Sequence, residues 1–363
     1  MEKNIIVNAT ALSTSGALTI LKQFIKNTEN HLQYHFICFI PCDLNLIKPK
    51  NVTFIEIPKM NWLKRVLWDS FKLKAWLSNR DIKPHKVISL QNTSINIDAD
   101  QIIYLHQPLP FSEVSWSIFK KEEFKLFLYK YFYSLFIFFF VKESTVFVVQ
   151  TNWMKDALSK KFGIPEGRIE TIKPEVIFPS NIVYNTEVKS SGCQKLLYPA
   201  VPVFYKNHTL ILDAMKYLKG LNKLEKSQFQ VTFKEGDYPL FDKIALEHDL
   251  VDFIEYLGVL PYEELMGKYL GAKCILFPSY VETYGLPLAE AAYFGKKVLC
   301  SDIAFAHDVL EGYSGAVFLD YKNSKIWGDA ISKVLSEDIA DDFKINKSGL
   351  KEKTGWNDFF NLI

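Results

Sequence analysis

The sequence has no extended apolar stretch at its start. Met1 to Asn4 lead directly into the short apolar segment Ile5–Val7, without a basic leader and without a small-residue cleavage site. Cysteine is scarce, and the few cysteines are odd in number, scattered and free of both CxxC and metal-ligand spacing with histidine. They are Cys38, Cys42, Cys193, Cys274 and Cys300. We therefore expect a cytoplasmic protein with reduced thiols, and not a secreted, disulfide-bonded one.

An excess of charge of one sign is missing as well. Lys and Arg number 43 and Asp and Glu number 41, which leaves a net charge of +2. Such a chain has no global field that attracts polyanions, so nucleic acid is not expected as a partner. No biased tract is present, and 48% hydrophobic with 23% charged residues is typical of a packed enzyme. At roughly 150 residues per domain, the 363 residues predict about two domains.

Two series of strand-like apolar runs alternate with helical or loop segments, which favours parallel sheets of the α/β class. The first series comprises residues 5–7, 35–40, 52–57, 86–90, 101–105 and 146–150. The second series comprises residues 195–198, 228–233, 254–257, 274–277 and 297–300. The polar, proline-bearing stretch Pro174–Gly192 separates them, so we place one domain at 1–180 and another at 181–349. Residues 350–363 are expected to form a closing helix that packs back on the first domain.

The stretch Ile275–Ala291 carries the clearest functional signal. It passes from a strand through a loop into a helix that Pro287 is well suited to begin. Helix N-termini at the carboxyl end of a parallel sheet present unpaired N–H groups and a partial positive charge, which suits a diphosphate. Glu282 in the loop and Glu290, expected in the first helical turn, could accept hydrogen bonds from sugar hydroxyls. Taken singly, each could instead be a solvated carboxylate or a complement to the helix dipole.

This stretch resembles the Glu-x7-Glu motif of the family 4 retaining glycosyltransferases, with Phe-Pro-Ser before it. The resemblance implies the GT-B fold, in which two Rossmann-like domains face each other across a cleft. It also implies that Glu282 contacts the donor sugar and Glu290 the nucleotide ribose. The backbone at Gly285 and Leu286 would hold the diphosphate, with Thr283 and Tyr284 also in the donor site. Tyr284 stands where the family more often has Phe.

A second segment of the later domain fits the same resemblance. Lys206 and Asn207 follow the strand at 196–198, and a lysine at the carboxyl end of a strand can neutralise a leaving diphosphate. A loop lysine taken alone is usually just solvated. The family usually has an arginine about six residues before this lysine, where the present chain has Ala200. The resemblance implies that Lys206 and Asn207 belong to the donor site.

Two segments of the first domain complete the predicted site. His106 follows the strand that ends at Leu105, and the resemblance implies that it faces the donor sugar. A lone histidine after a strand is more often structural. The loop Ser13–Gly16 resembles a glycine-bearing loop that lies beneath the phosphates and the acceptor, and it places Gly16 in the donor site.

Neither a metal nor a cofactor is expected. Asp98-Ala99-Asp100 matches the Asp-x-Asp motif that holds a metal-bound diphosphate in other glycosyltransferases, but it precedes a strand instead of following one. The family that the chain resembles typically needs no divalent ion.

Two segments of the first domain could contact a membrane. Asn61–Leu77 mixes Trp, Leu and Phe with Lys and Arg, as an interfacial amphipathic helix does, and Phe124–Val141 is rich in Phe and Tyr. Both segments could instead be buried helices of the first domain. Contact with an anionic membrane, at the inner face of the plasma membrane, is therefore one expectation.

The predicted function is retaining, metal-independent transfer of a hexose-type sugar from a UDP- or GDP-sugar to a saccharide or lipid-linked saccharide acceptor. By resemblance, the process is assembly of bacterial surface polysaccharide, such as O-antigen, lipopolysaccharide or capsule. Two alternatives stay open. A GT-B nucleotide-sugar epimerase would share the fold, and a non-catalytic sugar-binding or scaffold subunit would fit the missing arginine.

Overall fold

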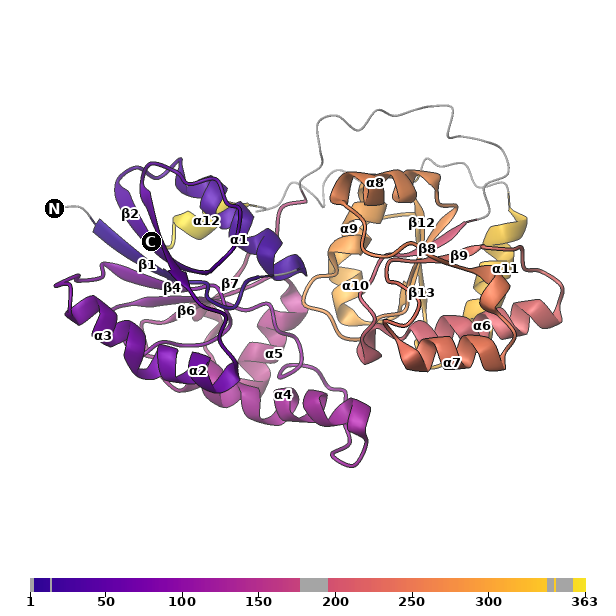
Figure 1. Ribbon diagram of the computed structural model, residues 1–363, viewed down its shortest axis with the longest axis horizontal. Helices are drawn as coiled ribbons and strands as arrows, with labels where there is room; N and C mark the ends of the chain where they lie inside the picture. The colour runs from indigo at the N-terminus through magenta and orange to yellow at the C-terminus, as the bar shows by residue number, and fades with distance from the viewer. Residues whose placement is uncertain (1–2, 14, 177–194, 338–342, 344–354) are drawn as a thin grey trace. The chain divides into compact units, whose positions relative to one another are not determined.

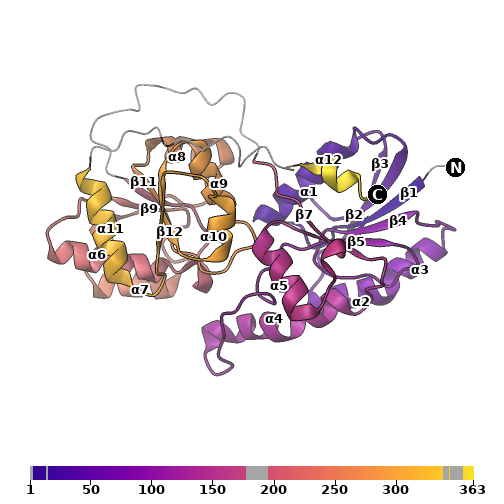
Figure 2. The same cartoon turned by 180° about the vertical axis from the view of Figure 1, so that it is seen from behind.

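The structure is a computed structural model that describes residues 3–13, 15–176, 195–337, 343 and 355–363. Contacts within the chain divide it into two compact units. Unit 1 is Met1–Glu175 with Lys353–Ile363, and unit 2 is Val176–Glu352. Each unit contains one sheet with helices on both faces (Figures 1 and 2), and all strand pairs in both sheets are parallel. The prediction of an α/β fold with two parallel sheets is thus confirmed.

Unit 1 holds a seven-stranded sheet in the order β3-β2-β1-β4-β5-β6-β7. Its strands are β1 (Lys3–Asn8), β2 (Tyr34–Pro41), β3 (Val52–Ile57), β4 (Lys86–Ser89), β5 (Gln101–Tyr104), β6 (Val146–Val149) and β7 (Ile169–Thr171). Its helices are α1 (Ser15–Thr28), α2 (Trp62–Leu67), the π-helical turn η1 (Trp68–Lys72), α3 (Leu73–Ser78), α4 (Lys121–Phe138), α5 (Asn152–Phe162), the short 3-10 turn η2 (Glu166–Arg168) and α12 (Trp356–Phe360).

Alternate residues of β1 serve two hydrophobic cores, one on each face of the sheet. Ile5 and Val7 face a core shared with α1 and α12, whereas Ile6 faces a core shared with η1 and α3. This alternation follows from the two-residue period of a strand. Helix α12 lies beside α1 in both views (Figures 1 and 2), and the ring of Phe24 on α1 contacts the rings of Trp356 and Phe359. The last residues of the chain therefore help to form the core of unit 1.

The contribution of α12 to stability can be measured with Phe359, whose side chain is fully buried. We expect Phe359→Ala to lower the free energy of unfolding of unit 1 by about 3 kcal/mol or more, because the substitution removes apolar contacts and leaves a cavity. Urea unfolding followed by near-ultraviolet circular dichroism tests this. Asn357→Ala, on the exposed face of the same helix, serves as the control and should change stability little.

Unit 2 holds a six-stranded sheet in the order β10-β9-β8-β11-β12-β13. Its strands are β8 (Leu196–Tyr198), β9 (Phe229–Val231), β10 (Ile254–Tyr256), β11 (Cys274–Phe277), β12 (Lys297–Ser301) and β13 (Ala316–Leu319). Its helices are the 3-10 turn η4 (Phe204–Lys206), α6 (His208–Gly220), α7 (Pro239–Glu247), the 3-10 turn η5 (Val251–Phe253), α8 (Tyr262–Gly271), α9 (Leu286–Tyr293), α10 (Ala304–Val309) and α11 (Ser324–Ser336). Helix α6 packs against α7 and α11, and α9 packs against α10 and β12.

Every strand expected from the sequence is present, and two others were not anticipated. These are β7 and β13, which are short edge strands with only one buried residue each, so their buried pattern is weak. The segment Pro174–Gly192, where we expect the domain boundary, lies almost entirely outside the described residues. Of the five cysteines, Cys193 also lies outside them, and the other four form no disulfide.

The two aromatic-rich segments of unit 1 are helical. Asn61–Leu77 forms α2, η1 and most of α3, and Phe124–Val141 lies mainly in α4. Helix α2 has no buried residue, whereas η1, α3 and α4 each bury some of their side chains, and both segments expose large apolar side chains. Contact with a membrane stays a prediction. In the described part of the chain, no helix combines the length and apolar character needed to cross a bilayer.

Candidate active site

The site in unit 2 is built where two neighbouring strands end. Strands β8 and β11 pair in parallel, with Leu196 opposite Cys274 and Leu197 opposite Ile275. Because parallel strands have their carboxyl ends at the same edge of a sheet, the loops that follow β8 and β11 emerge side by side. The first loop carries Lys206 and Asn207, and the second carries Glu282.

These two loops bring Lys206 and Glu282 into direct contact. The Lys206 ammonium forms an ion pair with Oε1 of Glu282, and both side chains are mostly buried, with exposed fractions of 12% and 14%. The hydroxyl of Ser279 donates to the same carboxylate oxygen at 2.7 Å. The ammonium also lies over the ring of Phe277, 5.6 Å from its centroid. The carboxylate is thus held by two donors from different segments of the chain.

Backbone contacts fix the two loops against each other. The amide of Tyr280 donates to the carbonyl of Tyr205 at 3.1 Å, and the buried Tyr198 hydroxyl donates to the carbonyl of Lys206 at 2.6 Å. Asn207 adopts a left-handed conformation with φ of 59° just before α6, and its side-chain amide donates to the carbonyl of Tyr321 at 2.9 Å. Asparagine tolerates this backbone conformation better than most residues. Its side-chain hydrogen bond to Tyr321 therefore anchors the loop.

Helix α9 begins at Leu286, with Pro287 in its first turn as the sequence predicts. Gly285 precedes it with φ of 85°, a conformation that favours glycine, and an added Cβ would contact Leu288 and Phe277. Tyr284 is buried, and burial raises the pKa of its phenol to about 12. The loop therefore turns sharply into the helix, and the positive end of the helix dipole lies at Leu286.

The structure places Glu290 differently from the sequence expectation. It lies in the second turn of α9, not the first, because the helix starts at Leu286. Its carboxylate is buried and accepts hydrogen bonds from Tyr269 at 2.7 Å and Tyr262 at 3.2 Å, both on α8. Burial raises the pKa of Glu290, and the two phenol donors oppose that rise. These tyrosines were not anticipated, because nothing in the sequence pairs α8 with this glutamate.

His106 lies in unit 1, two residues after β5. Its amide donates to Oδ1 of Asn92 at 2.5 Å, and its Nε2 lies 2.8 Å from the carbonyl of Leu90. Because a carbonyl only accepts, Nε2 carries the proton and Nδ1 is the unprotonated nitrogen. Burial lowers the pKa of His106, and the Leu90 carbonyl partly offsets this. His106 is therefore a neutral, fixed imidazole at neutral pH.

The residues after β4 that hold His106 also join a buried network that sequence reasoning missed. Asp69, in the π-helical turn η1, accepts hydrogen bonds from Asn8 at 2.7 Å, Gln91 at 3.1 Å and Thr93 at 2.7 Å. Gln91 in turn accepts from the Thr10 hydroxyl at 2.9 Å and from the amide of Ala11 at 3.1 Å. A single buried carboxylate thus ties together the loops that follow β1 and β4.

Asp69 should make stability depend on pH. Burial raises its pKa from 3.8 to about 6, against the opposing effect of its hydrogen bonds and of Arg65. The folded protein therefore holds this proton more tightly than the unfolded chain does, so the contribution of Asp69 to stability falls as pH rises from about 4 to about 6. We expect wild type to lose about 1 kcal/mol relative to Asp69→Asn between about pH 5 and about pH 8. Urea titrations of both proteins at the two pH values measure this, and parallel curves would contradict it.

Gly16 and Ala200 are two further positions that the sequence analysis singled out. Gly16 lies within α1, which begins at Ser15, and not in the preceding loop; no atom lies within 4 Å of an added Cβ there. Nothing in the described structure requires glycine at this position. Ala200, where a family arginine is absent, is buried just after β8, and its amide donates to the carbonyl of Tyr198.

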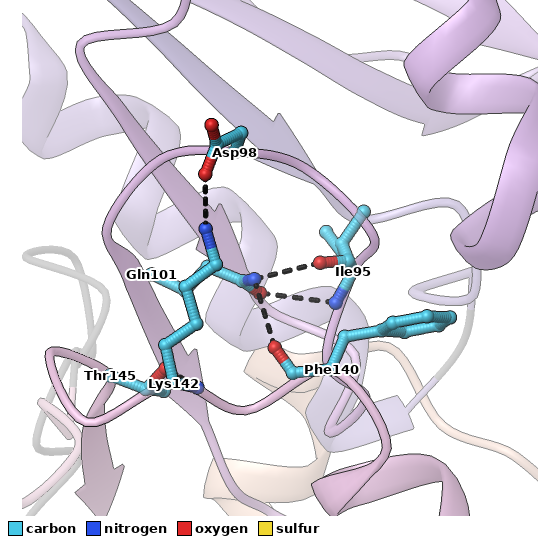
Figure 3. Close-up of polar contacts among 6 residues, drawn as sticks. All are labelled: Ile95, Asp98, Gln101, Phe140, Lys142 and Thr145. Carbon is cyan, nitrogen blue, oxygen red and sulfur yellow. Dashed lines mark hydrogen bonds and ion pairs between the residues drawn. The ribbon is translucent and has the colours of Figure 1, made fainter.

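In the Asp98-Ala99-Asp100 segment, Asp98 is engaged in an ion pair within unit 1. Asp98 forms an ion pair with Lys142 at 2.6 Å, and the side-chain amide of Gln101 bonds the backbone of Ile95 and Phe140 (Figure 3). The Asp98 side chain is almost fully exposed. Among the described residues, no group of three or more His, Cys, Asp or Glu side chains could hold a metal ion.

Comparison with known proteins gives matches over both units. Residues 186–349 match the family model described as glycosyl transferases group 1. The chain is 22% identical over 287 residues to the O-antigen chain mannosyltransferase RfbU of Salmonella typhimurium, which covers 76% of this chain and 72% of that protein.

Solved structures share the fold at low sequence identity. One is WaaG, a glycosyltransferase involved in lipopolysaccharide biosynthesis, with a TM-score of 0.66, 15% identity and coverage of 92% of this chain and 90% of that one. Another is HepE of Anabaena in complex with UDP and glucose, with a TM-score of 0.63, 12% identity and coverage of 93% and 90%.

Proposed function

We propose that the chain is a GT-B glycosyltransferase of the group 1 type. It would move a sugar from a nucleotide-sugar donor to a saccharide acceptor. The observation that carries this proposal is the contact between Lys206 and Glu282, at the carboxyl ends of adjacent strands and one loop away from the start of α9. A paired cation and carboxylate beside a helix N-terminus can serve both halves of a nucleotide sugar. The cation and the helix suit the diphosphate, and the carboxylate suits the sugar hydroxyls.

The chemistry proposed for this site is departure of the nucleotide diphosphate from the anomeric carbon. The bond between that carbon and the phosphate oxygen breaks, and Lys206 with the N-terminal end of α9 stabilises the charge that develops on the oxygen. Glu282 orients the sugar through its hydroxyls, and Glu290 binds the ribose. The acceptor oxygen bonds to the carbon on the face that the phosphate leaves, and its proton passes to the departing phosphate. The configuration is thereby retained.

Metal independence is part of the same proposal. A divalent ion in other sugar transferases offsets the negative charge of the diphosphate. Here Lys206 and the start of α9 offer positive charge at the edge of the sheet that the donor would approach. Transfer in excess EDTA at the rate seen without it supports this part of the proposal. A rate that collapses with EDTA and returns with Mg²⁺ or Mn²⁺ refutes it and leaves the transfer itself intact.

We also propose that the product is a bacterial surface polysaccharide and that the acceptor is a saccharide or a lipid-linked saccharide. The similarity to an O-antigen chain mannosyltransferase and the shared fold of WaaG support this assignment. The decisive experiment incubates the purified protein with a panel of UDP- and GDP-sugars and measures nucleotide release. Release with at least one donor is expected. A non-catalytic scaffold would release none, and an epimerase would convert the donor sugar without releasing the nucleotide.

The exposed apolar side chains of unit 1 support contact with an anionic membrane. Large apolar residues on α2, η1 and around α4 are 40% or more exposed, and we call them the apolar band: Trp62, Leu63, Leu67, Phe71, Phe124, Leu128, Tyr131, Phe132, Leu135 and Phe139. The rings of Trp62 and Phe136 pack together at 4.7 Å and join the two helices. Exposed lysines flank the band at positions 64, 72, 74, 121 and 125. Apolar side chains among lysines are typical of a helix that lies in a membrane interface.

Flotation with vesicles that contain anionic lipid tests this contact. We expect the combined variant Phe71→Ser with Leu135→Ser to lower the vesicle partition coefficient at least tenfold, because each exposed apolar side chain contributes on the order of 1 kcal/mol when buried in lipid. Leu246→Ser is the matched control, since Leu246 is 72% exposed and lies in unit 2. A protein that stays wholly in solution, or a variant that floats like wild type, would remove the membrane from the proposal.

A further inference from the structure

A pocket in unit 1 lies between the two halves of the apolar band and plays no part in the donor site. It has a volume of about 120 Å³ and is lined by α2, η1, the segment after β4 and the end of α4. Since a cavity needs roughly 10–15 Å³ in this measure for one water molecule, the pocket has room for several water-sized groups. It can therefore hold a compact polar group together with the first atoms of an attached chain.

The walls of the pocket are mainly apolar. Trp62 and Val66 line it from α2, and Phe136, Phe139 and Phe140 line it from the end of α4. Trp62 and Phe139 are themselves members of the apolar band, with exposed fractions of 41% and 74%. The pocket therefore opens among side chains that would meet lipid in the proposed membrane contact, and an apolar chain could run from the band into it.

Most polar groups of the pocket are already satisfied by the protein. The Asp69 carboxylate accepts three hydrogen bonds, Thr93 donates one of them, and the Ser94 hydroxyl both donates to the Phe136 carbonyl and accepts from the Phe140 amide. Gln91 accepts two bonds through its side-chain oxygen and donates through its nitrogen. These groups bond one another and the backbone, so they have little hydrogen-bonding capacity left for a ligand.

Arg65 is not satisfied in this way. It lines the pocket, its Nε is buried without a hydrogen-bond partner, and within the described residues its guanidinium forms no ion pair. Asp69 attracts it without reaching ion-pair distance. A guanidinium that is partly withdrawn from water and left without an acceptor is a strong site for a phosphate or carboxylate. Its aromatic surroundings require that this anion carry an apolar group.

We propose that this pocket binds the phosphate-bearing end of an apolar chain, with the phosphate on Arg65 and the chain along Trp62, Val66 and Phe136. If the proposed function is correct, this ligand is the lipid part of a lipid-linked acceptor, so the inference rests on that function. The pocket would then anchor the acceptor in unit 1 independently of the donor site. The membrane itself would contribute the route of entry and not the binding energy of the phosphate.

Isothermal titration of the full-length protein with decyl phosphate, below its micelle concentration and without vesicles, tests the pocket. We expect saturable binding to one site, at least tenfold weaker binding of decanol, and no displacement by millimolar inorganic phosphate. Arg65→Gln should raise the Kd at least tenfold, whereas Lys64→Gln, its exposed neighbour on the same helix, should change the Kd less than twofold. Val66→Phe, which fills the pocket, should abolish binding.

Equal affinity for decyl phosphate and decanol, or unchanged binding in both Arg65→Gln and Val66→Phe, would overturn the inference. Should Arg65→Gln fail to fold, the comparison of phosphate with alcohol and the Val66→Phe variant still decide it. A wild-type protein that releases nucleotide from a donor sugar but ignores decyl phosphate refutes the pocket and leaves the proposed function standing. Binding of decyl phosphate without any nucleotide release refutes sugar transfer and leaves the pocket.

Discussion

Replacing Lys206 by alanine should lower kcat about 100-fold or more, which corresponds to about 2.7 kcal/mol of lost transition-state stabilisation. In the proposed reaction, negative charge accumulates on the leaving diphosphate as its bond to the sugar breaks, so the ammonium would stabilise the transition state more than the bound donor. KM for the donor should therefore change much less than kcat. Steady-state kinetics with the donor found in the panel experiment provide both constants.

Two controls separate catalysis from folding in this experiment. Lys216→Ala removes an exposed lysine from α6, in the same unit, and should leave kcat within twofold. Lys206→Arg keeps the charge but changes its shape, and we expect it to recover part of the lost rate. A Lys206→Ala protein with wild-type turnover would show that this cation plays no part in departure of the diphosphate.

Replacing Glu282 by alanine should also reduce turnover about 100-fold or more, for a different reason. In the proposed function the carboxylate orients the donor sugar, so its loss would remove hydrogen bonds to the sugar as well as the partner of Lys206. Because the ion pair is mostly buried, Glu282→Ala leaves an unpaired ammonium and should destabilise unit 2. Turnover must therefore be measured well below the melting temperature of the variant. Glu263→Ala, on the exposed surface of α8, is the matched control.

The double variant Lys206→Ala with Glu282→Ala distinguishes a catalytic pair from a purely structural ion pair. If the two residues only stabilise the fold, removing both should restore stability and activity together, because no charge is left unpaired. We expect stability to recover relative to Glu282→Ala while turnover stays at or below that of either single variant. Recovery of turnover in the double variant would count against the roles proposed for both side chains.

The positions of Lys206 and Glu282, each in a loop that follows a strand, could be predicted from the sequence. Each residue stands a few positions after a continuous apolar run, and such runs predict buried parallel strands. What the sequence does not reveal is that these two runs are neighbours in the sheet, because strand order depends on packing across the whole unit. The resemblance to a known motif placed both residues in one donor site, and the structure shows that their strands are neighbours and that the two side chains form an ion pair.

Other contacts of the site could not be foreseen. Tyr262 and Tyr269 hold Glu290 because α8 packs beside α9, a tertiary relation that leaves no trace in the spacing of these residues. Asp69 was also missed, since it lies within a segment whose pattern predicts an amphipathic helix with its polar residues in solvent. The π-helical turn η1 disturbs the helical phase and places Asp69 inside.

The amide of Tyr280 donates to the carbonyl of Tyr205, so one of the contacts between the loops that carry Lys206 and Glu282 involves main-chain atoms alone. Any residue except proline can supply that amide, and any residue can supply that carbonyl. The side chains at both positions can therefore be changed without loss of this main-chain bond, provided that position 280 is not proline.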